Sequence, residues 1–221
     1  MAGRTIVKGR GMPGKDDANY RLYSDGTILL FGVRMSYPHF GKPYQGKPNE
    51  DGSLPAKKFS VKLMLPKATH ENAKKICEMQ IDKILDGDTL KADFKFLKDG
   101  DLEGKAELKD HWIVNASEGE DRRPALRGLN GEKIDAEHVG ERKIDDMFQG
   151  GYWCDALISP WRQKAHGRKV NASIRAVKLA RKDETFGEGG IADEDIDDAF
   201  GISGDTGGFE DDKPAAADDD L

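Results

Sequence analysis

The alternation of apolar and polar residues predicts several β-strands, of which the clearest covers residues 57–65 (KKFSVKLML). Its apolar positions run two apart from Phe59 to Leu65, so they share one face of the strand. The residues between them, including Lys58 and Lys62, face the other way. We therefore expect one side of this strand to pack in the core while the other side presents lysines.

Three further segments show the same period of two. In residues 26–37 (GTILLFGVRMSY) the apolar positions run two apart from Leu29 to Tyr37. This spacing predicts that Leu29, Tyr37 and the apolar positions between them face inward. Residues 152–159 (YWCDALIS) and 169–179 alternate as well. Their outward positions include Trp153, Asp155, Lys169 and Arg175. Residues 111–116 (HWIVNA) predict one more short strand.

Residues 70–85 show helical rather than strand spacing. Apolar residues recur there three and four positions apart, Thr69 can cap the start, and Gly87 can end the helix. Strands that are half polar, with no regular alternation of strand and helix, favour a small antiparallel sheet or barrel. The sequence therefore predicts a mostly β, OB-fold-like antiparallel barrel with one main helix.

The charge is divided unevenly along the chain. Residues 183–221 hold 15 acids and one base, a net charge of −14, whereas residues 1–182 hold 34 bases and 26 acids, a net charge of +8. A basic body favours a polyanionic ligand, and an acidic end favours protein partners or imitation of that polyanion. The acidic end finishes with Asp218, Asp219, Asp220 and Leu221.

These observations divide the chain into three parts. Residues 1–20 carry scattered glycines and bases and are expected to form a flexible basic arm. Residues 21–182 are expected to fold as the barrel domain. Residues 183–221 have too few large apolar side chains to offset the entropy of ordering, so we expect a disordered tail.

The two cysteines and the N-terminal sequence bear on the compartment. Cys77 and Cys154 both lie in apolar patterns, which is typical of reduced cysteines in a core rather than of a disulfide framework. The first residues have no apolar run like that of a signal peptide, and no segment reaches membrane-spanning length. We therefore expect a soluble, cytoplasmic protein.

The sequence contains no strong catalytic motif. It has neither a phosphate-binding P-loop nor the His/Cys spacing of a zinc site, so no cofactor and no metal are expected. One fragment, Glu141-Arg142-Lys143, has the acid-x-lysine form of metal-dependent nucleases, with Asp135 nearby. A triplet of this kind arises easily by chance in a chain that is 34% charged. A nuclease remains an alternative hypothesis.

Aromatic residues lie close to bases in several places. Single-stranded nucleic acid is bound by ring faces, on which bases stack, and by cations along the phosphate path. Trp153, Trp161, Tyr44 and Phe40 are candidates for stacking, although core positions are an equally ordinary use of such residues. The candidate cations are Arg122, Arg123, Arg127, Arg162, Lys164, Arg168, Lys169, Lys58, Lys62 and Arg175.

Four segments, taken in order, resemble those of phage single-stranded DNA-binding proteins. The chain is similar in this respect to the replication single-stranded DNA-binding proteins of T7-like phages. They are GTILLFGVRMSYPHF at residues 26–40, KKFSVKLMLPK at 57–67, GGYWCDALISPW at 150–161, and the terminal DDDL. Each segment is loose alone, and their order carries the resemblance. Such tails often end in an aromatic residue or in Pro-Phe, whereas this chain ends in Leu221.

The resemblance implies an OB-fold that binds single-stranded DNA without sequence preference and without catalysis. It also implies a role in phage DNA replication, recombination or repair, in the cytoplasm of the bacterial host. The acidic tail would contact replication or recombination proteins, and it is expected to compete with DNA for the basic groove. A homodimer, RNA as ligand, and a DNA-mimic regulator acting through the tail remain open alternatives.

Overall fold

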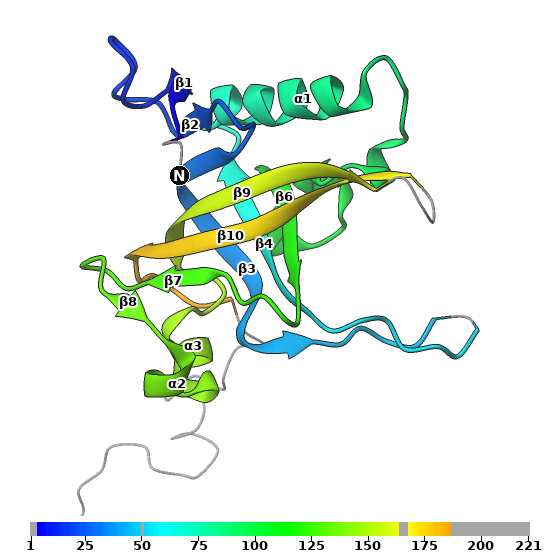
Figure 1. The fold of residues 1–221 in the computed structure, drawn as a ribbon, viewed down its shortest axis with the longest axis vertical. Helices are drawn as coiled ribbons and strands as arrows, with labels where there is room; N and C mark the ends of the chain where they lie inside the picture. The colour runs from blue at the N-terminus through cyan, green and yellow to red at the C-terminus, as the bar shows by residue number, and fades with distance from the viewer. Residues whose placement is uncertain (1–3, 50, 164–167, 187–221) are drawn as a thin grey trace, which may run out of the picture. The chain divides into compact units, whose positions relative to one another are not determined.

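The computed structural model describes residues 4–49, 51–163 and 168–186 of the 221-residue chain. Figure 1 shows these residues as a strongly curved sheet with helices at its two ends. The strands are β1 (Ile6–Gly9), β2 (Tyr20–Tyr23), β3 (Ile28–Tyr44), β4 (Lys58–Pro66), β5 (Leu97–Asp99), β6 (His111–Gly119), β7 (Ala125–Arg127), β8 (Lys133–Ile134), β9 (Trp153–Gln163) and β10 (Lys169–Arg181). The α-helices are α1 (Glu71–Leu85), α2 (Ala136–Val139) and α3 (Glu141–Met147), and single 3₁₀ turns cover Ala92–Phe94, Gly100–Leu102 and Ala106–Leu108.

Five strands close into a barrel. The neighbours run in the order β3, β4, β6, β10 and β9, and β9 pairs with β3 to complete the circle. All of these pairs are antiparallel except β6 with β10, which is parallel. The predicted OB-fold-like barrel is confirmed. Because the sheet is closed, it leaves no long edge strand to be covered.

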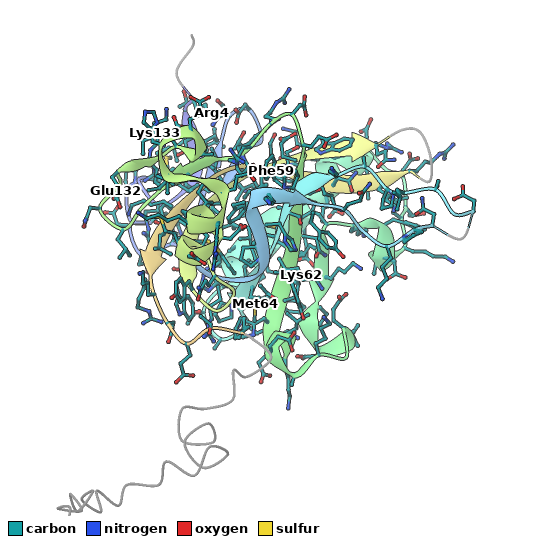
Figure 2. The ribbon with its side chains drawn as sticks, turned by 90° about the horizontal axis from the view of Figure 1, so that it is seen from below. Arg4, Phe59, Lys62, Met64, Glu132 and Lys133 are labelled. Atoms are coloured by element: carbon teal, nitrogen blue, oxygen red, sulfur yellow. The ribbon has the colours of Figure 1, made fainter. Side chains whose placement is uncertain are left out.

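The alternation in β4 has the predicted consequence. Phe59, Val61 and Leu63 are buried inside the barrel, while Lys58 and Lys62 lie on its outer face. Figure 2 labels Phe59 and Lys62 on this strand. Apolar positions of β9 and β10, such as Cys154 and Val170, fill the same core. The barrel is thus held together mainly by one face of each strand. On the opposite face, Met64 and Ile113 pack in a second, smaller cluster, and Lys58 and Lys62 lie at the surface.

The alternation in β3 departs from the prediction in its first half. Ile28 and Leu30 are fully buried, whereas Leu29, which was predicted to face inward, is only half buried. The pairing with β9 shifts after Leu30, and Gly32 there has a φ of +59°, which favours glycine. This bulge reverses the alternation, so that Val33 and Met35 point inward as predicted. The prediction that Tyr37 also faces inward is wrong, because this residue is exposed and has a φ of +49° that turns its side chain out.

The main helix, α1, lies along one end of the barrel, and the short helices α2 and α3 lie toward the other end (Figure 1). The apolar stripe of α1, from Ala73 to Leu85, is buried against the core. Its first residue follows His70, and Thr69, the expected cap, instead bonds the His70 ring through Oγ1 and Nδ1 at 2.8 Å. The helix ends at Asp86 in the left-handed region, followed by Gly87.

Two predicted boundaries differ from the structure. Residues Ile6–Gly9, expected in a flexible arm, form β1 and pair with β2. Asp183–Phe186, expected in the tail, pack on the barrel, where Phe186 contacts the small cluster of Met64, Leu108 and Ile113. The backbone N–H of Phe186 also donates to the carbonyl oxygen of Gly150 at 2.8 Å. The rest of the predicted tail, residues 187–221, lies outside the described residues.

Two further expectations concern single residues and helices. Cys77 and Cys154 are free thiols buried in the core, as predicted. Burial raises the pKa of the Cys77 thiol to about 12 and also raises that of Cys154. Among the helices of the described residues, none combines the length and the apolar character needed to span a lipid bilayer.

Candidate nucleic-acid interface

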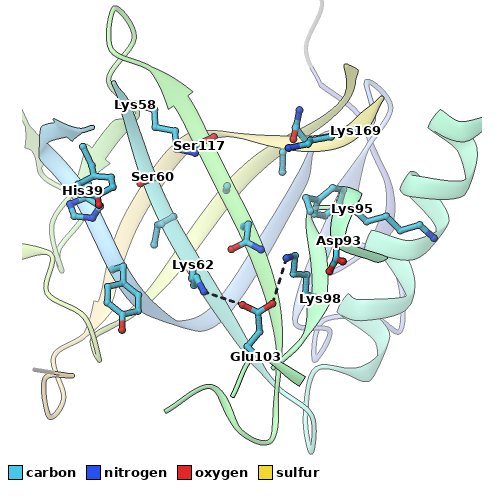
Figure 3. A pocket seen from close by; sticks show the side chains of 18 of the residues that line it. His39, Lys58, Ser60, Lys62, Asp93, Lys95, Lys98, Glu103, Ser117 and Lys169 are labelled. Carbon is cyan, nitrogen blue, oxygen red and sulfur yellow. Dashed lines mark hydrogen bonds and ion pairs between the residues drawn. The ribbon is translucent and has the colours of Figure 1, made fainter. Parts of the chain in front are cut away.

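A groove of about 760 Å³ lies on the outer face of β4 and β6. Lys58, Ser60 and Lys62 alternate with the core residues of β4, and the register pairs them with the end of β6. Asn115 pairs with Lys62 and Ser117 pairs with Ser60, so four polar side chains form its floor. Figure 3 shows this floor from close by. Since the floor and the core come from the same two strands, the packing of the barrel holds the floor of the groove in place.

The rim of the groove comes from parts of the chain that are distant in sequence. The end of β3 supplies Tyr37 and Tyr44 on one side, and the start of β10 supplies Lys169 on the other. The segment between α1 and β6 closes a third side with Phe94 and several charged residues. The outer face of the second and third barrel strands is the surface on which OB-folds bind oligonucleotides.

The groove is strongly basic. Six lysines and two acids line it, which gives a net charge of +4. The lysines are Lys58, Lys62, Lys95, Lys98, Lys105 and Lys169, and the acids are Asp93 and Glu103. Figure 3 shows that the Lys95 side chain is directed away from the middle of the groove. A concentration of one sign of charge in a concave surface attracts a polyanion more strongly than scattered charges do.

Two tyrosines expose ring faces beside these lysines. Tyr37 is 48% exposed and Tyr44 is 45% exposed. The ring of Tyr44 stacks on His39, with 4.7 Å between ring centroids and 16° between planes. Burial lowers the pKa of His39, so this ring is neutral near neutral pH and supports Tyr44 without adding charge. A held, exposed ring is the element on which a nucleobase stacks.

Tyr37 has a different support. The ammonium of Lys105 donates to its hydroxyl at 2.7 Å, and this hydrogen bond raises the pKa of Lys105. The Tyr37 hydroxyl in turn donates to Glu107 Oε1 at 3.2 Å. Tyr37 itself has a φ of +49°, an uncommon value for a tyrosine, which turns its side chain out at the point where β3 leaves the barrel.

Comparisons with known proteins identify the family to which this chain belongs. The family model described as "Enterobacter phage Enc34, ssDNA-binding protein" matches residues 27–207. This chain belongs to that family. A solved structure of the single-stranded DNA-binding protein from bacteriophage Enc34 in complex with ssDNA is 33% identical, covers 76% of this chain and 94% of its own, and superposes with a TM-score of 0.67. The same phage protein, in a second structure, is 30% identical over 87% of this chain and 98% of its own, with a TM-score of 0.68.

The other comparisons add little to this assignment. The structure of gp2.5, a single-stranded DNA-binding protein encoded by bacteriophage T7, is 15% identical, with a TM-score of 0.41 over 86% of this chain and 98% of its own. At that distance the likeness supports no statement about this chain. No curated protein matches the sequence. The resemblance to phage single-stranded DNA-binding proteins is confirmed through the Enc34 family.

In this member of the Enc34 family, the structure brings some of the sequence-predicted residues together. Lys58, Lys62, Lys169 and Tyr44 all line the groove. Trp161 is 44% exposed and pairs with Asn171, a groove residue, across β9 and β10. Directly paired residues of antiparallel strands point to the same face. Trp161 therefore extends the groove face toward the β9–β10 turn, where Lys164 lies outside the described residues.

Phe40 does not fit its predicted role. Its side chain is fully buried and meets the edge of the Phe148 ring at 5.7 Å between centroids. A ring without an exposed face cannot stack on a base, so the prediction that Phe40 stacks on a base is wrong. The cause is the long β3 strand, which turns Phe40 inward onto α3 and leaves Tyr37 and Tyr44 outside.

Three predicted arginines are held by partners outside the groove. The guanidinium of Arg123 donates to the carbonyl oxygens of Phe40 and Gly41 at 2.9 and 2.7 Å. Arg162 forms an ion pair with Asp88, and Arg175 forms one with Glu118 at 2.9 Å. These contacts already occupy the guanidinium groups of the three residues, so a phosphate would have to compete with them.

The remaining predicted cations lie at the surface or near it. Arg122 and Arg168 are exposed, and neither lines the groove. Arg127 is half buried in β7 and bonds the carbonyl oxygen of Leu126 at 2.9 Å. The terminal residues Asp218, Asp219, Asp220 and Leu221, predicted to bind partners, lie outside the described residues.

Trp153 lies away from the groove, on the outer face where β9 pairs with β3 and β10. Its Nε1–H donates to Asp183 Oδ2 at 2.6 Å, and this bond lowers the pKa of Asp183. The guanidinium groups of Arg181 and Arg34 lie 4.9 and 5.5 Å from its ring centroid. In the described residues Trp153 thus anchors the segment that follows β10.

Sequence reasoning missed the third side of the groove. Phe94, Lys98, Lys105 and Glu103 come from residues 88–110, for which the sequence predicted no element. This segment holds only short 3₁₀ turns and the three-residue β5, so it shows no periodicity. The signal available was compositional: Phe94 stands between lysines, the same mixture that marked the other candidates.

Proposed function

We propose that the chain binds single-stranded DNA along the groove between β3, β4, β6 and the start of β10. Membership of the Enc34 family makes it a single-stranded DNA-binding protein. The observation that supports this location is the groove itself, where a net charge of +4 lies beside two exposed tyrosine rings. We assign the phosphate path to Lys58, Lys62 and Lys169, and base stacking to Tyr37 and Tyr44.

Binding of this kind does not depend on base sequence. Lysine ammonium groups contact phosphates as point charges, and a ring face accepts any base. The hydrogen-bonding side chains on the floor, Asn115 and Ser117, lie between lysines rather than in a separate pocket that would select one base. We infer that sequence preferences are weak and come from stacking strength.

We further propose that the protein is a binder and not an enzyme. The residues of the nuclease alternative have other partners: Glu141 pairs with Arg123 at 3.4 Å, and Asp135 accepts from the backbone N–H of Glu137 at 3.2 Å. Within the described residues, no three His, Cys, Asp or Glu side chains cluster in a way that suits a metal ion. These placements favour DNA binding without cleavage.

The acidic end of the chain is proposed to recruit proteins of phage replication, recombination or repair in the host cytoplasm. Residues 187–221 carry 13 acids and one base, a net charge of −12. Removing them should tighten DNA binding at low salt if they compete for the groove. Because Asp183–Phe186 pack on the barrel, the truncation should follow Phe186 and not Lys182. Unchanged affinity in that variant would contradict the competition.

The test of the proposed function is a titration with an unlabelled thymidine oligonucleotide, followed by protein fluorescence and by a mobility shift. We expect saturable binding that weakens as salt rises, and intact oligonucleotide after incubation with Mg²⁺. Absence of any complex would refute the proposal that the groove binds single-stranded DNA. Cleavage that survives purification and is lost in Glu141→Gln would instead favour the nuclease.

A further inference from the structure

One carboxylate lies between two lysines of the groove. Glu103 Oε2 is 3.3 Å from the ammonium nitrogen of Lys62, and Glu103 Oε1 is 3.5 Å from that of Lys98. Lys62 comes from β4 and Lys98 from β5, and both strands pair with β6. Figure 3 shows the two contacts as dashed lines that meet at Glu103. Each oxygen of the carboxylate therefore forms an ion pair with a lysine of a different strand.

This arrangement has the form of a phosphate site. A phosphodiester also presents two charged oxygens on one atom, and lysines bind it as point charges. The three side chains are about a quarter exposed, at 24% for Glu103, 25% for Lys62 and 27% for Lys98, so solvent and ligand reach them. Ion pairs that are open to water contribute little to stability and are easily exchanged.

The position of Glu103 in the chain allows that exchange. It follows the 3₁₀ turn Gly100–Leu102 and precedes Gly104, whose φ of +69° favours glycine. The acid is carried by a connecting segment and not by a barrel strand, so its movement does not disturb the core. Lys62 and Lys98, in contrast, lie on strands β4 and β5, so the position of their backbone does not depend on Glu103.

We propose that Glu103 occupies a phosphate position in the free groove and is displaced when single-stranded DNA binds. The proposal rests on the proposed DNA-binding function and adds a specific contact to it: one backbone phosphate bridges Lys62 and Lys98 in the complex. Glu103 thereby lowers the affinity for short anions, which cannot contact enough other lysines to displace it. A strand that also contacts Lys58 and Lys169 can.

The test compares Glu103→Gln with Asp110→Asn, measured against the same thymidine oligonucleotide. Both substitutions remove one negative charge from the segment between β5 and β6, but Asp110 is exposed and does not line the groove. We expect Glu103→Gln to tighten binding by about three- to tenfold at low salt, with a smaller gain at high salt, and Asp110→Asn to change it by less than about twofold.

A double-mutant cycle separates the bridge from general electrostatics. In a Lys62→Gln/Lys98→Gln background, the gain from Glu103→Gln should fall to that of Asp110→Asn, because the phosphate position has been removed. Glu103→Asp, whose shorter side chain cannot span both lysines, should give an intermediate gain and covers the case in which Glu103→Gln folds poorly.

The outcomes distinguish this proposal from the function on which it rests. If the wild-type protein binds the oligonucleotide but Glu103→Gln and Asp110→Asn behave alike, the displacement is refuted and DNA binding stands. If the gain persists without Lys62 and Lys98, the bridging phosphate is refuted. If the wild-type protein binds no oligonucleotide, the proposed groove itself fails.

Discussion

Replacing two groove lysines gives a quantitative test of the proposed phosphate path. Lys58 and Lys169 line the groove, and neither forms a salt bridge with another described residue. Each contact between a cation and a phosphate of a single strand contributes about 0.7 to the slope of log K against log salt. The variant Lys58→Gln/Lys169→Gln should therefore reduce this slope by about 1.4.

That change is large enough to measure. Between about 50 and 200 mM salt, the wild-type protein should lose about sevenfold more affinity than the double variant. The control is Lys8→Gln/Lys178→Gln, which removes the same charge from lysines that do not line the groove. Fluorescence titrations with one oligonucleotide at four salt concentrations give both slopes. Equal slopes for the two double variants would refute the phosphate path.

The structure supports four further predictions. Tyr44→Ala should weaken DNA binding by about 1–3 kcal/mol, while Tyr44→Phe should keep the wild-type affinity. Phe40→Ala should lower the free energy of unfolding, measured in urea titrations, by about 3–5 kcal/mol. Burial lowers the pKa of His70, so the unfolded chain takes up a proton first as pH falls. The stability present above about pH 6.5 should then decline on acidification by at most about 1.4 kcal/mol per pH unit, and less in His70→Gln. Cys77 and Cys154 should react with a thiol reagent only after unfolding, and rapid labelling of the folded protein would contradict their burial.

The sequence correctly predicted the inward and outward sides of strands in which apolar and polar residues alternate without interruption. β4 and β9 alternate without interruption, so the inward positions from Phe59 and from Cys154 were correct. In β3 the alternation is reset at Gly32, where a bulge needs a backbone conformation that the sequence shows only as one glycine among 26. The pattern on either side of that glycine carries no information about which phase is buried.

The prediction of the site was limited by contacts between distant residues. Lys58, Lys62 and Lys169 were found because their own strands place them outside. Arg162 and Arg175 looked equally suitable, but their carboxylate partners lie 74 and 57 positions away in the chain. Whether a base is available for phosphate thus depends on which acids the fold brings beside it, and local sequence does not show this.

The same period of two that builds the core also separates stability from binding. In β4 a shift of one residue would place Lys58 and Lys62 inside the barrel and Phe59 outside, which would bury unpaired charge at a cost of several kcal/mol. The register is therefore fixed strongly by the core, and the spacing of the groove lysines is fixed with it. Because outward residues contribute little to that register, the groove tolerates changes of charge that the core does not, and substitutions at Lys58 or Glu103 should alter affinity without altering the fold.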